Sequence, residues 1–134
     1  MITDTIKPLK GHVTIEVLDG NTVVKILEKD NAITANMKNV VRRAIAGEPY
    51  HIDEIKVYAA GVLLATGTLT TDFSMADTVI FTSIFNESSF SGTFDELNLC
   101  VSYDTSIFSI LTAISITKAV DQKVSIRWKL KIQQ

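Results

Sequence analysis

The end of the chain carries the clearest alternation of polar and apolar positions. From Lys123 to Ile132 every second residue is apolar. A period of two is typical of a β-strand with one dry face and one wet face, whereas a helix would spread the same residues around its circumference. The set predicted to face a core is Val124, Ile126, Trp128, Leu130 and Ile132. The set predicted to face solvent or a neighbouring subunit is Lys123, Ser125, Arg127, Lys129 and Lys131.

The first part of the chain predicts a hairpin preceded by an arm. Alternation runs from His12 to Leu18 and puts Val13, Ile15 and Val17 on one face. The residues of Asp19–Gly20–Asn21 accept the positive φ of a tight turn, which leads into a second strand at Thr22–Lys29. Residues 1–10 show little periodicity, and Pro8 would remove a ladder donor from a sheet. We therefore expect residues 1–10 to form an N-terminal arm that becomes ordered against a partner.

The spacing of apolar positions changes after this hairpin. Between Ala35 and Ala46 they recur at helical intervals, which predicts one amphipathic helix. Gly47 suits the position after a helix end, and Pro49 prevents the helix from continuing. The sequence thus predicts a single helix with a defined stop.

Most of the remaining chain predicts strands. They are expected at Glu54–Ala59, Val62–Ala65, Thr78–Asn86, Gly92–Tyr103 and Ile107–Thr117. The last of these has Ile110, Thr112, Ile114 and Ile116 in step, and Thr68 to Asp77 is expected to be a polar loop. Together the patterns predict a mainly β fold. It would be an antiparallel two-layer β-sandwich, jelly-roll-like, of about eight strands, with one α-helix inserted after the first hairpin and residues 11–134 in a single domain.

Composition points to a protein that works with partners. Hydrophobic residues make up 46% of the 134 positions and the mean hydropathy is +0.24, which leaves more apolar surface than one small core needs. The net charge of -2 argues against nucleic-acid binding, which normally requires an excess of Lys and Arg. No apolar run approaches the roughly 20 residues that cross a bilayer, so we expect a protein that is cytosolic when made and has no membrane partner.

No residue pattern predicts catalysis or cofactor binding. His12 and His51 lack the paired spacing of a zinc site, and Cys100 is expected to be a buried, inert thiol in a strand. Adjacent carboxylates such as Asp53 and Glu54 would point to opposite faces of a strand, and the serines at 88 and 89 lack a glycine-flanked nucleophile elbow. We therefore expect no enzyme, no cofactor and no metal.

Basic residues gather in two places, on the expected helix at Arg42 and Arg43 and along the last strand. One interpretation is a solvated face. The other is charge matching with an acidic neighbour in an assembly, which would set register more than affinity. Exposed lysines on a terminal strand would also deter unwanted edge pairing.

Four segments of the chain share a pattern with a known family. They are Gly11–Val17 with its Asp19–Gly20 turn, Glu28–Ile33 leading into the helix, Ile114–Lys118 followed by Val124–Trp128, and Asp95–Leu99. In these segments the chain resembles small structural proteins of tailed bacteriophages, which are often found around the tail or at the neck between head and tail. Proteins of this kind often carry a glycine-rich stretch after the third strand. This chain departs from that pattern with Val62–Leu63–Leu64 between Gly61 and Gly67.

The resemblance implies a non-enzymatic structural subunit of a tailed-phage virion, made in the host bacterial cytoplasm and assembled in or onto a ring at the tail or head–tail neck. Its partners would be other copies of itself and other virion proteins, since a closed ring needs complementary patches on each copy. The interface candidates are Ile2, Ile6, Leu9, Arg42, Arg43, Lys129 and Lys131.

Other functions remain open at this stage. A capsid decoration protein would use a related fold and the same kind of surface. A carbohydrate-binding β-sandwich module would need an exposed aromatic platform, for which Tyr50, Tyr58 and Tyr103 are the candidates. A hydrolase is a further, minor alternative, for which the sequence offers no credible nucleophile.

Overall fold

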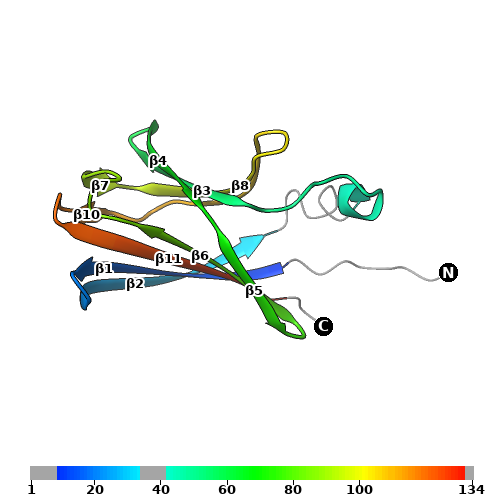
Figure 1. The fold of residues 1–134 in the computed structure, drawn as a ribbon, viewed down its shortest axis with the longest axis horizontal. Helices are drawn as coiled ribbons and strands as arrows, with labels where there is room; N and C mark the ends of the chain where they lie inside the picture. Colours follow the sequence, from blue (N-terminus) through cyan, green and yellow to red (C-terminus); the bar gives the residue numbers. More distant parts are fainter. Residues whose placement is uncertain (1–8, 34–41, 132–134) are drawn as a thin grey trace.

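The protein is mainly β-structure with antiparallel pairing. The computed structural model describes residues 9–33 and 42–131, which contain eleven strands and one short helical segment at residues 42–45 (Figure 1). The strands are β1 (Leu9–Asp19), β2 (Thr22–Ile33), β3 (Glu54–Ala59), β4 (Val62–Thr68), β5 (Thr70–Met75), β6 (Thr78–Phe85), β7 (Gly92–Phe94), β8 (Glu96–Val101), β9 (Ser106–Leu111), β10 (Ile116–Lys118) and β11 (Gln122–Lys131). The mainly β, antiparallel character is confirmed. The expected number of about eight strands is wrong, since eleven are present.

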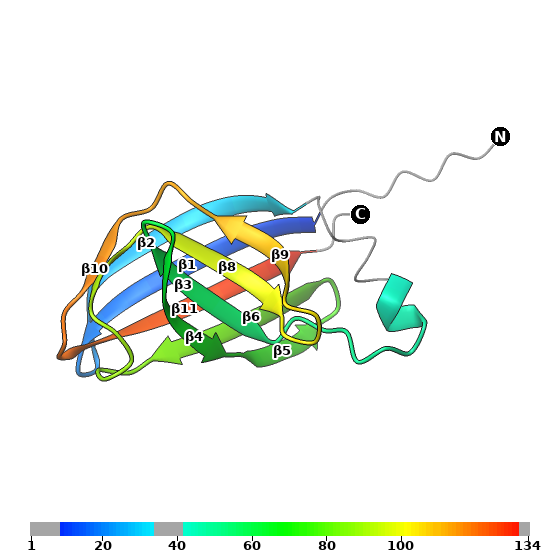
Figure 2. The same ribbon diagram turned by 90° about the horizontal axis from the view of Figure 1, so that it is seen from above.

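The strands form two main sheets that lie face to face. One has five strands in the order β2-β1-β11-β6-β5, and the other has four in the order β4-β3-β8-β9. Figure 2 shows the four-stranded sheet lying over the five-stranded one. Strands β7 and β10 pair with each other as a small third sheet. Strand β11 is central in the larger sheet because it pairs with β1 on one side and β6 on the other.

The core lies between the two main sheets, and β11 supplies its centre. The alternation predicted for this strand is confirmed: Val124, Ile126 and Trp128 are fully buried and Leu130 nearly so, while Arg127, Lys129 and Lys131 are exposed. Ile132 lies outside the described residues. From the other strands the core receives Val13, Ile15, Val17, Ile55, Val57, Phe81, Phe85, Phe94, Leu97 and Leu99.

Polar side chains join the two sheets along one side. The Lys29 ammonium on β2 donates to the Ala113 carbonyl at 3.0 Å, and the Asn31 amide donates to the Ile110 carbonyl at 3.0 Å. The Ser109 hydroxyl in turn donates to Asn31 Oδ1 at 3.1 Å. Strand β2 of the larger sheet is therefore tied to β9 of the smaller one by side-chain bonds.

The end of the expected helix is confirmed, and its beginning lies outside the described residues. Residues 42–45 are helical, and Gly47 has a φ of +84°. The Glu48 amide donates to the Arg43 carbonyl and the Gly47 amide donates to the Ala44 carbonyl, which together form a Schellman cap. This left-handed position is the reason that glycine follows the helix.

Three expected boundaries are wrong. The expected polar loop at Thr68–Asp77 contains β5, an exposed edge strand that is held by its ladder to β6 and has no buried face. The expected strand Ile107–Thr117 is two strands, because Ala113 adopts a φ of +59° between β9 and β10. The expected strand Gly92–Tyr103 is likewise divided, at Asp95, into β7 and β8.

A buried lysine fastens the loop after β6. Lys118 on β10 is fully buried, and its ammonium donates to the carbonyls of Glu87, Phe90 and Ala119 at 3.1, 2.7 and 3.1 Å. The Phe90 ring lies 5.4 Å from the same ammonium. These bonds give the buried charge the partners that burial requires.

A glycine on β4 allows a close approach between the two sheets. A Cβ atom at Gly67 would lie 2.3 Å from Ser83 Oγ and 2.6 Å from Phe85 Cζ, both on β6. Because Ser83 and Phe85 are themselves buried, neither side chain has free space to move into. Backbone packing at this corner thus requires the absence of a side chain.

Replacing Gly67 with alanine should therefore lower the free energy of unfolding by about 1–3 kcal/mol, the usual cost of overpacking. Urea denaturation of the purified protein measures this loss. Thr66→Ala, an exposed neighbour on the same strand, is the matched control and should change stability by no more than about 0.5 kcal/mol. Equal stability of the Gly67→Ala variant and the wild type would contradict the close approach.

Candidate functional site

The outer face of the five-stranded sheet carries opposite charges side by side. We call Glu28 and Asp30 on β2 the acidic strip, and Arg127, Lys129 and Lys131 on β11 the basic strip. Strand β1 runs between the strips, with Lys10, His12 and Thr14 turned to the same face. All five strip residues are exposed. On β11 the residues of opposite parity fill the core, which is why the side chains of the basic strip point outward.

The strand register places the charges in rows. Along one row, Asp30 lies opposite His12 and His12 lies opposite Lys129. Along the next, Glu28 lies opposite Thr14, which lies opposite Arg127. Lys10, His12, Asp30, Lys129 and Lys131 line a hollow of about 310 Å³ on this face. Each row therefore runs from an acid on β2 to a base on β11.

His12 is held by the acidic strip. Its Nδ1 lies 2.7 Å from Asp30 Oδ1 and its Nε2 lies 3.3 Å from Glu28 Oε1, to which the Thr14 hydroxyl also donates at 3.5 Å. The hydrogen bond to Asp30, followed by the one to Glu28, raises the pKa of His12 above 6.5. The same hydrogen bond lowers the pKa of Asp30 below 3.8.

This arrangement predicts a small dependence of stability on pH. Because the pKa of His12 is raised in the folded protein, its stabilising effect is fully present below pH 6.5 and is lost as the pH rises through the raised pKa. The effect should stay below about 1 kcal/mol, since the pair is solvent-exposed and screened. Urea denaturation across this pH window should show the loss for the wild type. The His12→Gln variant should not show it, and identical pH profiles of the two proteins would refute the assignment.

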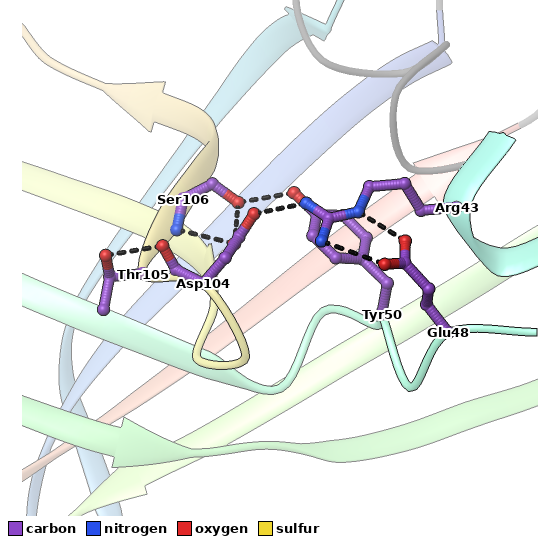
Figure 3. A network of polar contacts seen from close by, with 6 residues as sticks. All are labelled: Arg43, Glu48, Tyr50, Asp104, Thr105 and Ser106. Atoms are coloured by element: carbon purple, nitrogen blue, oxygen red, sulfur yellow. Dashed lines mark hydrogen bonds and ion pairs between the residues drawn. The ribbon is translucent and has the colours of Figure 1, made fainter.

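A second polar cluster surrounds Arg43 at the end of the short helix (Figure 3). Arg43 Nε donates to Glu48 Oε2 at 2.6 Å, and Arg43 Nη1 donates to Asp104 Oδ2 at 2.6 Å. Its guanidinium carbon lies 4.2 Å from the centre of the Tyr50 ring, and the Tyr50 hydroxyl lies 2.5 Å from Ser106 Oγ. The hydrogen bond to Glu48 raises the pKa of Arg43 and lowers that of Glu48. This cluster joins the helix end to the β8–β9 hairpin.

The structure places the expected interface residues in different settings. Ile2 and Ile6 lie outside the described residues, and Leu9 begins β1 where the arm was expected to continue. Arg42 is exposed on the short helix, and Arg43 makes polar contacts within the chain. Lys129 and Lys131 lie exposed in the basic strip. Of the seven, only Lys129 and Lys131 are brought together on one described surface.

The candidate aromatic platform does not form a common exposed surface. Tyr50 is 3% exposed beneath Arg43, whereas Tyr103 is 52% exposed and packs edge-on against Tyr50 at 6.3 Å between ring centres. Tyr58 is partly buried on β3. A hollow of about 370 Å³ has a mostly apolar wall, with few polar groups that could orient a ligand. Its lining residues are Tyr50, His51, Ile52, Thr71, Phe73, Val79 and Phe81.

Residues 9–33 and 42–131 show neither a metal cluster nor a membrane-spanning helix. No group of three or more His, Cys, Asp or Glu side chains in that part of the chain is placed to hold a metal ion. No helix among the same residues is long and apolar enough to cross a membrane. Cys100 is buried as expected, and burial raises the pKa of its thiol to about 11. A thiol of this kind is a poor nucleophile at neutral pH.

Comparison with known proteins identifies no relative, so a functional argument depends on the residues of this chain. No protein-family model matches the chain, and no curated protein or solved structure matches it either.

Proposed function

We propose that this protein is a non-enzymatic structural subunit that acts by associating with further copies of itself in a larger assembly. The observation that carries the proposal is the outer face of the five-stranded sheet, where an acidic and a basic strip are exposed side by side on rigid strands. Charges arranged in this way give an interface its register and its selectivity for a partner.

Exposed apolar side chains support association as well. Ile26 and Ile84 belong to the same outer face and are 58% and 66% exposed, and Phe73 on the edge strand β5 is 75% exposed. Large apolar side chains that remain open to water next to patterned charges are typical of surfaces that are covered by a partner.

We infer the location of the assembly from the resemblance of the sequence to phage structural proteins. We accordingly place the subunit in or on a ring at the tail or head–tail neck of a tailed-phage virion, with other copies and other virion proteins as partners. Capsid decoration is the alternative site for the same kind of subunit. The sandwich-like pair of sheets would serve as a rigid support, and residues 1–8 would add contacts through Ile2 and Ile6.

Sedimentation velocity of the purified full chain over a wide concentration range tests the proposal. We expect oligomers whose population grows with concentration, and co-sedimentation with purified phage particles. A protein that stays monomeric at every concentration and does not sediment with particles would contradict the proposal. Retention of such a monomer on a glycan column would favour the carbohydrate-binding module instead.

A further inference from the structure

We infer that the outer face of the five-stranded sheet pairs with the same face of a second copy, around a two-fold axis that runs along β1. This inference rests on the proposed function, because it specifies one contact through which the copies associate. It requires that the acidic and basic strips are complementary to each other in charge and in spacing. It also places the outward side chains of β1, among them Lys10, His12 and Glu16, against their own copies on the axis.

The strand order supplies the spacing. Strands β2 and β11 flank β1 on either side, so a half-turn about an axis along β1 brings β2 of one copy over β11 of the other. This rotation does not change the position of a residue along the axis, so residues of one row stay in the same row. Asp30 then meets Lys129 of the second copy and Glu28 meets its Arg127. Each pair occurs twice, as in any isologous contact.

The charges within one chain leave the basic strip available for such a partner. No ion pair joins Arg127, Lys129 or Lys131 to another side chain of the described residues. The acidic strip is satisfied only in part, by the half-buried His12 and Thr14. Face-to-face sheets pack about 10 Å apart, a gap that a Lys or Arg side chain and an opposing carboxylate can bridge.

The mixed sign of the face selects a second copy over other partners. A polyanion such as nucleic acid would be attracted by the basic strip and repelled by the adjacent acidic strip. A polycation would be attracted by the acidic strip and repelled by the basic strip. Only a surface with both signs at the same spacing satisfies both strips, and an identical copy has that surface.

Apolar contacts extend the same pairing. Ile26 lies one row beyond Glu28 on β2, in the row that continues through Glu16 and Ser125 to Ile84. The half-turn places Ile26 over Ser125 of the second copy, one strand away from its Ile84. Two exposed isoleucines would thereby approach each other next to the ion pairs, and again on the other side of the axis.

Charge reversal tests the pairing in the full-length protein. In Glu28→Lys/Asp30→Lys both strips are basic. In Arg127→Glu/Lys129→Glu the acidic strip faces a strip of net negative charge, in which only Lys131 stays basic. Each variant should therefore repel itself, and its dissociation constant should rise by about tenfold or more. An equimolar mixture of the two variants restores every opposite-charge pair, and so does the variant that carries all four changes. We expect both to associate about as well as the wild type, as measured by sedimentation velocity.

The controls distinguish a failure of the pairing from a failure of the proposed function. Lys25→Glu changes an exposed charge on the opposite face of β2 and should leave association unchanged. Circular dichroism and thermal unfolding establish that each variant is folded. Unchanged association of both reversal variants, or failure of their mixture to associate, would overturn the pairing while the proposed function stands. A wild-type chain that does not associate at all would overturn both.

Discussion

Replacing Trp128 with alanine should lower the free energy of unfolding by about 3–5 kcal/mol, the cost of removing a large aromatic side chain from a packed core. The Trp128 side chain is fully buried on the central strand, opposite Val13 on β1 and Phe81 on β6. The cavity would open in the middle of the larger sheet. Urea denaturation of the purified variant measures the loss.

Two further variants sharpen this prediction. Trp128→Phe keeps an aromatic ring in the core and removes an indole nitrogen that has no hydrogen-bond partner in the described structure, so its loss should be much smaller. Arg127→Ala alters the exposed neighbour and should stay within about 0.5 kcal/mol of the wild type. A Trp128→Ala variant as stable as the wild type would contradict a core between the sheets. So would a wild-type indole that acrylamide quenches as fully as one in open solvent.

Replacing Lys118 with methionine should lower the free energy of unfolding by about 2–3 kcal/mol. The new side chain fills a similar volume, yet it leaves the carbonyls of Glu87 and Phe90 without the lysine donor, while the Ala119 carbonyl still accepts from the Gln122 amide. Burying an acceptor without a partner costs more than the net gain of an ordinary hydrogen bond. Urea denaturation gives the total loss, and hydrogen exchange should show that it is concentrated in residues 86–91.

The matched control is another lysine of the same region. Lys123 forms only a partly exposed pair with Glu87 at 3.7 Å, so Lys123→Met should cost no more than about 1 kcal/mol. If Lys118→Met stabilised the protein instead, the cost of desolvating the buried ammonium would exceed the stabilisation from its three hydrogen bonds.

Much of the fold follows from local patterns in the sequence. The alternation around Trp128 predicted both faces of β11, because a half-buried strand must separate polar from apolar residues. Gly47 predicted the end of the helix, because the cap requires a positive φ there. Each of these signals depends on the residues of one segment alone.

Other parts of the fold depend on contacts that a local pattern does not contain. Strand β5 is exposed along its whole length, so no apolar alternation marks it and only its ladder to β6 defines it. The spacing of Ile110 and Ile114 predicts that they share one face, yet Ala113 turns the chain between them. Ile110 is therefore half exposed while Ile114 is buried. An alanine at positive φ carries no sequence signal of its own.

The acidic strip shows why the candidate site was only half predicted. The sequence indicated the basic strip, but the side on which Glu28 and Asp30 emerge is set by a register shift between Val17 and Leu18. If the pairing of Leu18 with Val23 simply continued, His12 would lie opposite Lys29 and the two acids would point inward. One extra residue, Val24, reverses the faces of the rest of β2.

The place of β11 in the larger sheet also has a consequence for synthesis on the ribosome. β1 and β6 emerge long before the strand that must fit between them, so a nascent chain holds two separate hairpins with unsatisfied inner edges until residues 122–131 are released. A product truncated before Gln122 would keep those edges open and would be prone to aggregate, so the insertion of β11 is the step that completes the larger sheet.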